Sequence, residues 1–299
     1  MVAMDLSRIK DTVSKAADLQ NSKPSISLPL RRVGVSKVKT AVKAKLQEDH
    51  VLLPVTVDIF LDLPENLRGV HLSRCIEALQ QSVENLSQSS PLVELAVQTA
   101  KRLLQGNQYA TRSEVHIYSS HPFPRKAVLS GKAFTELLEA YAAAIVTRDQ
   151  GGRKIIGATF TVMLVCPCTM ELVKTFLEVS PPSIPSHTQR TLLTLAVSTD
   201  LEEQVTINDL IEIVEDSSHP AKSLLKRPDE IYEVLSAYQE PLFVEDLVRK
   251  ILLKASTKLF SLPEDTVVHI SAESLESVHP FNIKVEGSYT LRELHLLLD

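Results

Sequence analysis

The sequence predicts an α+β fold in which antiparallel sheets carry their helices on one face. One observation is the alternation of apolar and polar residues over residues 55–63, which is typical of a strand with one buried face. A second is the pair of helical segments that follows this strand. A third is the order of strands and helices, which recurs in the second half of the chain with little residue identity. Because a domain averages about 150 residues, a chain of 299 residues accommodates two such units.

The first unit is expected to span residues 28–150, after a polar leader at residues 1–27. Ser90 as the N-cap and Pro91 as the first helical residue open one of its helices, which Gly106 and Asn107 end. The elements expected before the middle of the chain are, in order, a short leader helix at 6–19, strands at 31–44 and 55–63, helices at 72–86 and 91–104, a strand at 110–119 and an amphipathic helix at 134–146.

The second unit is expected to span residues 151–299, after a linker at residues 149–152. Thr206 is the expected N-cap of one helix, with Asp209 well placed in its first turn. Because outer strands leave backbone groups unpaired, we expect a second copy to cover them in a homodimer or homotetramer. The elements expected here are, in order, strands at 155–165 and 191–198, helices at 206–216 and 243–260, and strands at 266–272 and 282–291.

Composition and charge argue against several classes of function. The formal net charge is −5 and the pI is about 6.0, so no global positive field attracts a nucleic acid. The chain has no Trp and only 5% aromatic residues, which leaves little material for stacking on bases. No apolar run is long enough to span a membrane, and residues 1–22 lack the apolar core of a signal peptide. We therefore expect a cytoplasmic protein that binds neither nucleic acid nor membrane.

The strongest local motif is Cys166-Pro167-Cys168, at the end of an apolar strand. Pro167 ends the hydrogen-bond ladder there, so both thiols project from the strand end. The pair is typical either of two small buried residues or of a metal or catalytic site. His187 follows across a proline-rich loop, just before the next strand. This spacing can bring the thiol and the imidazole together, and a surface or capping role for His187 is the alternative.

Carboxylates and a second imidazole extend this candidate metal site. Glu230 ends a charged segment, residues 226–230, that is also typical of a solvated helix start. Glu276 and His279 lie three residues apart, a spacing at which both can bind one metal. Glu245 is either a site residue or a charge that complements a helix dipole. One thiolate, two imidazoles and one or two carboxylates suit Fe(II), Zn(II) or Mn(II) in a catalytic site better than a closed structural zinc site.

An ordered set of motifs runs through nearly the whole chain. The motifs are Arg32-Val33-Gly34-Val35, Asp62-Leu63-Pro64, His71-Leu72-Ser73-Arg74, Tyr109-Ala110-Thr111-Arg112-Ser113-Glu114-Val115, Cys166-Pro167-Cys168, His187-Thr188-Gln189-Arg190, Leu225-Lys226-Arg227-Pro228-Asp229-Glu230, Phe243-Val244-Glu245-Asp246 and Glu276-Ser277-Val278-His279. In these motifs, over residues 28–295, the chain resembles the type IB GTP cyclohydrolases, and within them the archaeal MptA group. The resemblance implies a tunnelling fold, with two tandem ββααββ units per chain.

The resemblance also implies a reaction and roles for individual residues. The implied reaction is the hydrolytic opening of the imidazole ring of GTP with release of formate, by an Fe(II) enzyme in which Mn(II) or Zn(II) can substitute. Glu245 falls on the position that anchors the edge of guanine. The implied metal positions are Cys166, His187, Glu230 and His279; the implied catalytic positions are Cys166, Cys168, Glu276 and His279; and the candidates for binding the triphosphate are Arg74, Arg112, Arg190 and Lys226.

Three positions depart from the pattern of the family. Thr188 follows the implied metal His where Asn is common, Pro280 and Phe281 stand where another His is common, and Thr169 stands where Ser or Ala is usual. The implied metal ligands themselves are all present. Residues around a ligand orient it and tune the metal, so we expect these changes to affect metal preference and rate.

The product distinguishes two branches of the family. Archaeal members resemble this chain in length and at residues 262–265, and yield 7,8-dihydroneopterin 2′,3′-cyclic phosphate, formate and diphosphate on the way to methanopterin-type pterins. Bacterial members yield 7,8-dihydroneopterin triphosphate. We expect the archaeal reaction. The alternatives are the bacterial reaction, another tunnelling-fold activity, and a non-catalytic metal-binding oligomer.

Overall fold

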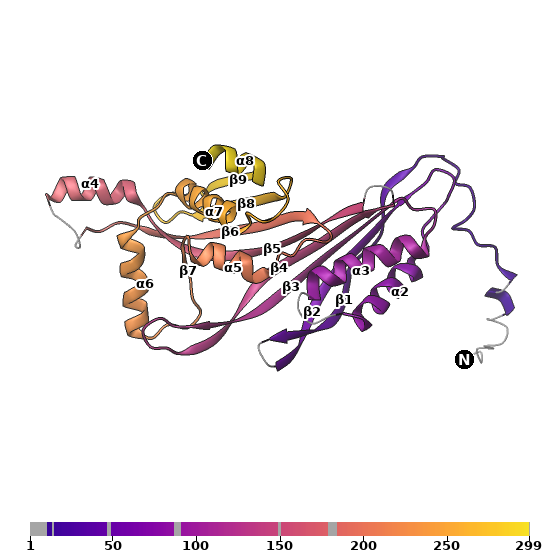
Figure 1. Ribbon diagram of the computed structural model, residues 1–299, viewed down its shortest axis with the longest axis horizontal. Helices are drawn as coiled ribbons and strands as arrows, with labels where there is room; N and C mark the ends of the chain where they lie inside the picture. Colours follow the sequence, from indigo (N-terminus) through magenta and orange to yellow (C-terminus); the bar gives the residue numbers. More distant parts are fainter. Residues whose placement is uncertain are drawn as a thin grey trace.

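One long antiparallel sheet runs through the molecule (Figure 1). The computed structural model describes residues 11–13, 15–46, 49–86, 91–148, 151–178 and 184–298. In this part of the chain the order of strands across the sheet is β1-β2-β3-β4-β5-β6-β8-β9, and the short strand β7 pairs with β5. The strands are β1 (Leu30–Leu46), β2 (Asp49–Leu63), β3 (Arg112–Lys126), β4 (Ala133–Thr147), β5 (Gly151–Val165), β6 (Thr188–Asp200), β7 (His219–Pro220), β8 (Val267–Leu275) and β9 (Ile283–Thr290).

Helices pack on one face of this sheet in two groups (Figure 1). One group, α2 and α3, contacts the first half of the sheet, and the other, chiefly α5 and α7, contacts the second half. The predicted α+β class, with antiparallel strands and helices on one face, is confirmed. The helices are α2 (Leu72–Glu84), α3 (Pro91–Gly106), α4 (Pro167–Leu177), α5 (Ile207–Glu215), α6 (Arg227–Gln239), α7 (Val244–Lys258) and α8 (Leu291–Leu298).

The core lies between the sheet and these helices and is continuous from one half of the chain to the other. In β2 the five apolar residues of the predicted alternation, from Val55 to Leu63, are all buried. The N-cap predicted for α5 is also present, because Thr206 and Asp209 form a reciprocal capping box. The N-cap predicted at Ser90 lies outside the described residues, as do residues 6–10 and 14 of the predicted leader helix.

The helix predicted at residues 134–146 is wrong, because this segment forms the central strand β4. Its run of alanines favours a helix in isolation. In the fold it pairs along its whole length with β3 and over half of it with β5, and those ladders override the propensity. Leu138, Ala140, Ala142, Ala144 and Val146 are buried with a period of two. The small side chains let α3 approach this part of the sheet closely. With β4 in place, the first half contains ββααββ, as the family resemblance implies.

Other differences from the prediction concern shorter elements. The helices α4 and α8 and the strand β7 were not predicted, and α6 was anticipated only as a helix start. The strand β3 continues past the predicted end through Pro122 and Pro124. These prolines pair with β4 but lie beyond Tyr118, the last residue of β3 that pairs with β2, so β2 requires no N–H group from them.

The linker predicted at residues 149–152 lies at a tight connection between paired strands. Thr147 of β4 pairs with Gly151 of β5, so the sheet continues without a break from one half to the other. Gly151 has a φ of +72°, a backbone conformation that glycine adopts at little cost. In the part of the chain that the structure describes, no helix combines the length and apolarity needed to cross a membrane.

Candidate active site

Two candidate ligands start from neighbouring strand ends. The strands β5 and β6 pair up to Val165 and Thr188. One residue further, the N–H of Cys166 donates to the carbonyl oxygen of His187 at 3.1 Å, and the hydroxyl of Ser186 donates to the carbonyl oxygen of Cys166 at 2.7 Å. The two strand ends thus bring the backbones of Cys166 and His187 together, as the spacing predicts.

Cys166 is also the N-cap of α4. Its Sγ accepts the N–H of Thr169 at 3.5 Å, and Pro167 occupies the first helical position. Cys168 is exposed in the first turn. None of the described residues of α4 is buried, and Figure 1 shows this helix projecting from the end of the sheet. Both thiols therefore lie at the end of the molecule, next to the chain that leads into β6.

The loop after β8 brings further candidates to the same end. The Nδ1 of His187 lies 3.1 Å from the hydroxyl of Ser277. His279 is exposed, and its ring stacks on Phe281 with centroids 5.1 Å apart and ring planes 7° apart. Phe281, one of the departures from the family pattern, is thus in direct contact with a candidate ligand. The sequence offered no signal for the contact to Ser277.

A cavity of about 490 Å³ lies between β6, the loop after β8 and α6. Three of the predicted site residues, Arg190, Glu230 and Glu276, line it, and Ser277 joins its wall to His187. This volume lies within the range of about 300–1,000 Å³ that is common for small-molecule sites. Of the eleven predicted site residues, the structure therefore places Arg190, Glu230 and Glu276 in the wall of one cavity and Cys166 and His187 beside it.

The wall of this cavity also contains an ion pair that sequence reasoning missed. Lys222 and Glu233 pair with each other, and both side chains are nearly buried. Glu233 follows Glu230 by three residues on α6, so the two carboxylates share one face of the helix. That spacing was the signal in the sequence that could have identified Glu233.

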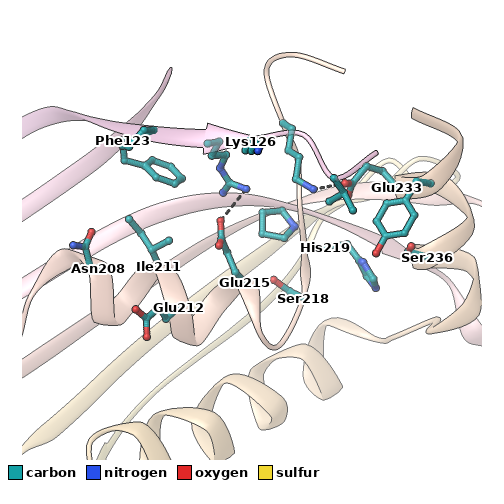
Figure 2. Close-up of a pocket in the computed structure, with 16 residues that line it drawn as sticks. Phe123, Lys126, Asn208, Ile211, Glu212, Glu215, Ser218, His219, Glu233 and Ser236 are labelled. Carbon is teal, nitrogen blue, oxygen red and sulfur yellow. Dashed lines mark hydrogen bonds and ion pairs between the residues drawn. The ribbon is translucent and has the colours of Figure 1, made fainter. Parts of the chain in front are cut away.

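A second cavity, of about 590 Å³, lies on the other side of β7 (Figure 2). His219, Pro220, Lys222 and Glu233 line both cavities. Burial lowers the pKa of His219, so its imidazole is neutral at pH 7. The two cavities are therefore separated only by β7 and the few residues that follow it.

The first turns of α6 and α7 hold three further residues of the motifs. Asp229 is fully buried, and hydrogen bonds from Ser130 and Leu129 lower its pKa to about 2. Lys226 is the exposed N-cap of α6. Glu245 is exposed in the first turn of α7, and Leu242, just ahead of that helix, donates its N–H to the carbonyl of Val165 at 3.2 Å. The start of α7 is thereby fixed next to Cys166.

Arg74 and Arg112 belong to the other half of the molecule. Arg112 begins β3 and forms an ion pair of 2.8 Å with Glu114, which also accepts from Arg32 at 2.8 Å. At about 3.3 Å per residue, the 14 steps of β3 place Arg112 about 45 Å from the hairpin that contacts α6. Arg74 lies on α2, where it donates to the carbonyl of Gly106 at 3.3 Å. Figure 1 shows α2 and α6 at opposite ends. Within one chain these arginines do not reach the cavity.

The candidate metal ligands fit a transition metal in their chemistry. Cys166, His187, Glu230 and His279 offer one sulfur, two imidazole nitrogens and a carboxylate, a mixture that suits Fe(II), Mn(II) or Zn(II). They come from four different segments at one end of the sheet. Within the described ranges, no three His, Cys, Asp or Glu side chains lie close enough together to hold a metal ion.

The fold is shared with solved structures of low sequence identity. The uricase from Arthrobacter globiformis superposes with a TM-score of 0.54 at 10% identity, over 89% of this chain and 96% of the uricase chain. A uricase from Bacillus fastidious superposes with a TM-score of 0.53 at 9% identity, over 89% and 95% of the two chains. These similarities define the fold class, which is the tunnelling fold that the resemblance implies.

The family is defined by sequence. Residues 16–284 match the model of the type I GTP cyclohydrolase folE2 family, and this chain belongs to that family. It is 36% identical to GTP cyclohydrolase MptA 1 of Methanocella arvoryzae, over 93% of this chain and 94% of that relative. It is 35% identical to GTP cyclohydrolase MptA of Methanosphaera stadtmanae, over 92% and 95% of the two chains. The family that the motifs indicate is thus confirmed.

Proposed function

We propose that this protein opens the imidazole ring of GTP by hydrolysis, releases formate and diphosphate, and forms 7,8-dihydroneopterin 2′,3′-cyclic phosphate. This reaction would be the first step towards a methanopterin-type pterin. The proposal rests on membership of the GTP cyclohydrolase family and on one observation, the cavity lined by Arg190, Glu230 and Glu276 beside the paired strand ends of Cys166 and His187.

Cys166, His187, Glu230 and His279 are the residues that would hold Fe(II), with Mn(II) or Zn(II) as substitutes. When bound, such an ion supplies Lewis-acid activation of the water that attacks C8 of the purine. Glu276 or His279 carries the protons that must move as formate leaves. Cys168, which is exposed two residues after Cys166, is the second cysteine of the proposed active site, near the purine ring that reacts.

Recognition of the substrate follows from charge and hydrogen bonding. Glu245 accepts two N–H groups from the edge of guanine, an arrangement of donors that adenine does not offer. Arg190 and Lys226 lie at the same end and bind phosphate oxygens. Arg74 and Arg112 contact the triphosphate only if a second copy of the chain brings them to this end, which supports a homodimer or homotetramer.

The test is an anaerobic assay with GTP after reconstitution with Fe(II). Formate and, after oxidation, pterin fluorescence are measured, and the pterin is identified by mass. We expect the cyclic phosphate. A triphosphate product would replace the archaeal reaction with the bacterial one, and a folded protein that binds metal without releasing formate would contradict an enzymatic role.

A pair of neighbouring variants tests the assignment of Glu245. Glu245→Gln exchanges one acceptor for a donor that faces the guanine N–H groups, so we expect a large rise in KM for GTP. Asp246→Asn is the matched control, because Asp246 instead pairs with Arg249 on its own helix at 2.6 Å. Equal KM values for the two variants would contradict the assignment.

A further inference from the structure

The hairpin between β3 and β4 meets the start of α6. In its turn, Ala127 donates its N–H to the carbonyl of Lys132 at 2.9 Å, and Gly131 has a φ of +65°. The turn leaves the N–H groups of Leu129 and Ser130 free of partners in the hairpin ladder. Both donate to the same oxygen of Asp229, at 2.9 and 3.0 Å.

Asp229 joins two segments that are about a hundred residues apart in sequence. Its second carboxylate oxygen accepts the N–H of Lys226 at 3.3 Å, which caps the first turn of α6. The residue is fully buried. A buried carboxylate is costly unless it is hydrogen-bonded, so the three amides and the carboxylate hold one another in place.

Few apolar contacts fix α6 in the fold. Its buried residues are Asp229, Glu233 and Ala237, while Ile231 and Leu235 are exposed. The position of the helix therefore depends chiefly on polar contacts, which are the ion pair of Glu233 with Lys222 in its middle and one contact at each end. At its C-terminal end, the hydroxyl of Tyr238 donates to the carbonyl of Ser186 at 2.8 Å. At its N-terminal end the contact is Asp229.

The hairpin itself is a fixed support. Arg125 pairs with Glu215 of α5 at 2.9 Å, and Figure 2 labels Glu215 at the end of a dashed line. Glu136, on the other strand of the hairpin, accepts the N–H of Ser223 at 2.6 Å and pairs with Arg125. These contacts join the hairpin to the second half of the chain independently of Asp229.

We propose that Asp229 is a positioning residue for the site: by fastening the first turn of α6 to the hairpin, it sets the place of Glu230 in the cavity wall. The inference rests on the proposed function, in which Glu230 is a metal ligand. It gives a role to a residue of the charged motif that the proposed reaction leaves unused. Asp229 contacts neither metal nor substrate in this scheme and acts through Glu230.

The test compares Asp229→Asn with Asp209→Asn in the full-length protein. Asn keeps the size of Asp but has one acceptor oxygen and no charge, so it cannot accept from both the hairpin amides and the N–H of Lys226, and the bonds that it keeps are weaker. Asp209 is the matched control, because it occupies the same third helical position in the capping box of α5 and accepts the N–H of Thr206 at 2.8 Å. Three quantities are measured: hydrogen exchange of the Leu129 and Ser130 amides, the dissociation constant of Mn(II), and kcat as a function of Mn(II) concentration.

We expect Asp229→Asn to speed exchange at both amides and to weaken Mn(II) binding by about 10- to 100-fold, the usual effect of losing a group that orients a ligand. Saturating Mn(II) should restore most of kcat, which a general loss of structure would not allow. Asp209→Asn should leave the exchange at the hairpin and the Mn(II) affinity unchanged.

A second variant acts from the side of the hairpin. Gly131→Ala strains the turn at its positive φ without touching α6, so it should weaken Mn(II) binding in the same direction even if Asp229→Asn does not fold. Unchanged Mn(II) affinity in both variants, with faster exchange at the hairpin, would overturn the inference and leave the proposed function standing. A wild-type protein that neither binds Mn(II) nor hydrolyses GTP would overturn both.

Discussion

Leu137 and Leu138 are neighbours on β4 that face opposite sides of the sheet. Leu138 is 6% exposed and belongs to the core, whereas Leu137 is 70% exposed. The same substitution to alanine at these two positions therefore tests the strand assignment at residues 134–146. A strand predicts one large and one small effect, because successive side chains alternate between its faces.

The magnitude follows from the atoms removed. Leu138→Ala deletes three buried carbon groups, which at about 0.8 kcal/mol each amounts to about 2.4 kcal/mol of lost transfer free energy. The cavity left behind adds to this, so we expect the free energy of unfolding to fall by about 3 to 4 kcal/mol. Leu137→Ala should change it by less than about 0.5 kcal/mol.

The assay is urea denaturation followed by circular dichroism, at two protein concentrations so that any effect on association is visible. The two variants should have the same slope with urea and clearly different midpoints. Equal losses of stability, or a larger loss for Leu137→Ala, would refute the alternation and with it the placement of β4.

Three further perturbations test the site and its support. Cys166→Ser should abolish GTP turnover while the circular dichroism spectrum and the thermal midpoint stay as in the wild type; full activity would remove Cys166 from the metal site. Thr206→Ala removes one half of the capping box of α5 and should cost about 1 kcal/mol of stability in thermal denaturation, and an unchanged midpoint would contradict the cap. Burial of Glu114 acts to raise its pKa, but hydrogen bonds from His116 and Arg112 outweigh it and lower the pKa below its ordinary 4.5. A carboxyl of this kind stabilises the fold above that value and loses its contribution as the pH falls, so Glu114→Gln should flatten the loss of stability between about pH 5 and pH 3. If the stability of Glu114→Gln fell with pH over this range as steeply as that of the wild type, the result would contradict this.

The sequence alone was sufficient for the elements that carry a strong local pattern. The alternation in β2 and the cap of α5 each depend on side chains a few residues apart, so they can be recognised without knowing the rest of the fold. The nearness of Cys166 and His187 was also predictable, because consecutive antiparallel strands place the end of one beside the start of the next. The family motifs added the residues that local patterns do not single out.

Other features depend on contacts between distant segments and were decided only by the tertiary structure. The alanine-rich residues of β4 favour a helix by themselves, and become a strand because β3 and β5 supply the hydrogen bonds on either side. The buried hydrogen bonds between the hairpin amides and Asp229 join residues about a hundred positions apart, and no periodic pattern in the sequence predicts them. The separation of Arg112 from Glu230 follows from the length and direction of β3. Local side-chain chemistry thus determined the elements and most of the reactive residues, whereas long-range pairing decided which of those residues meet.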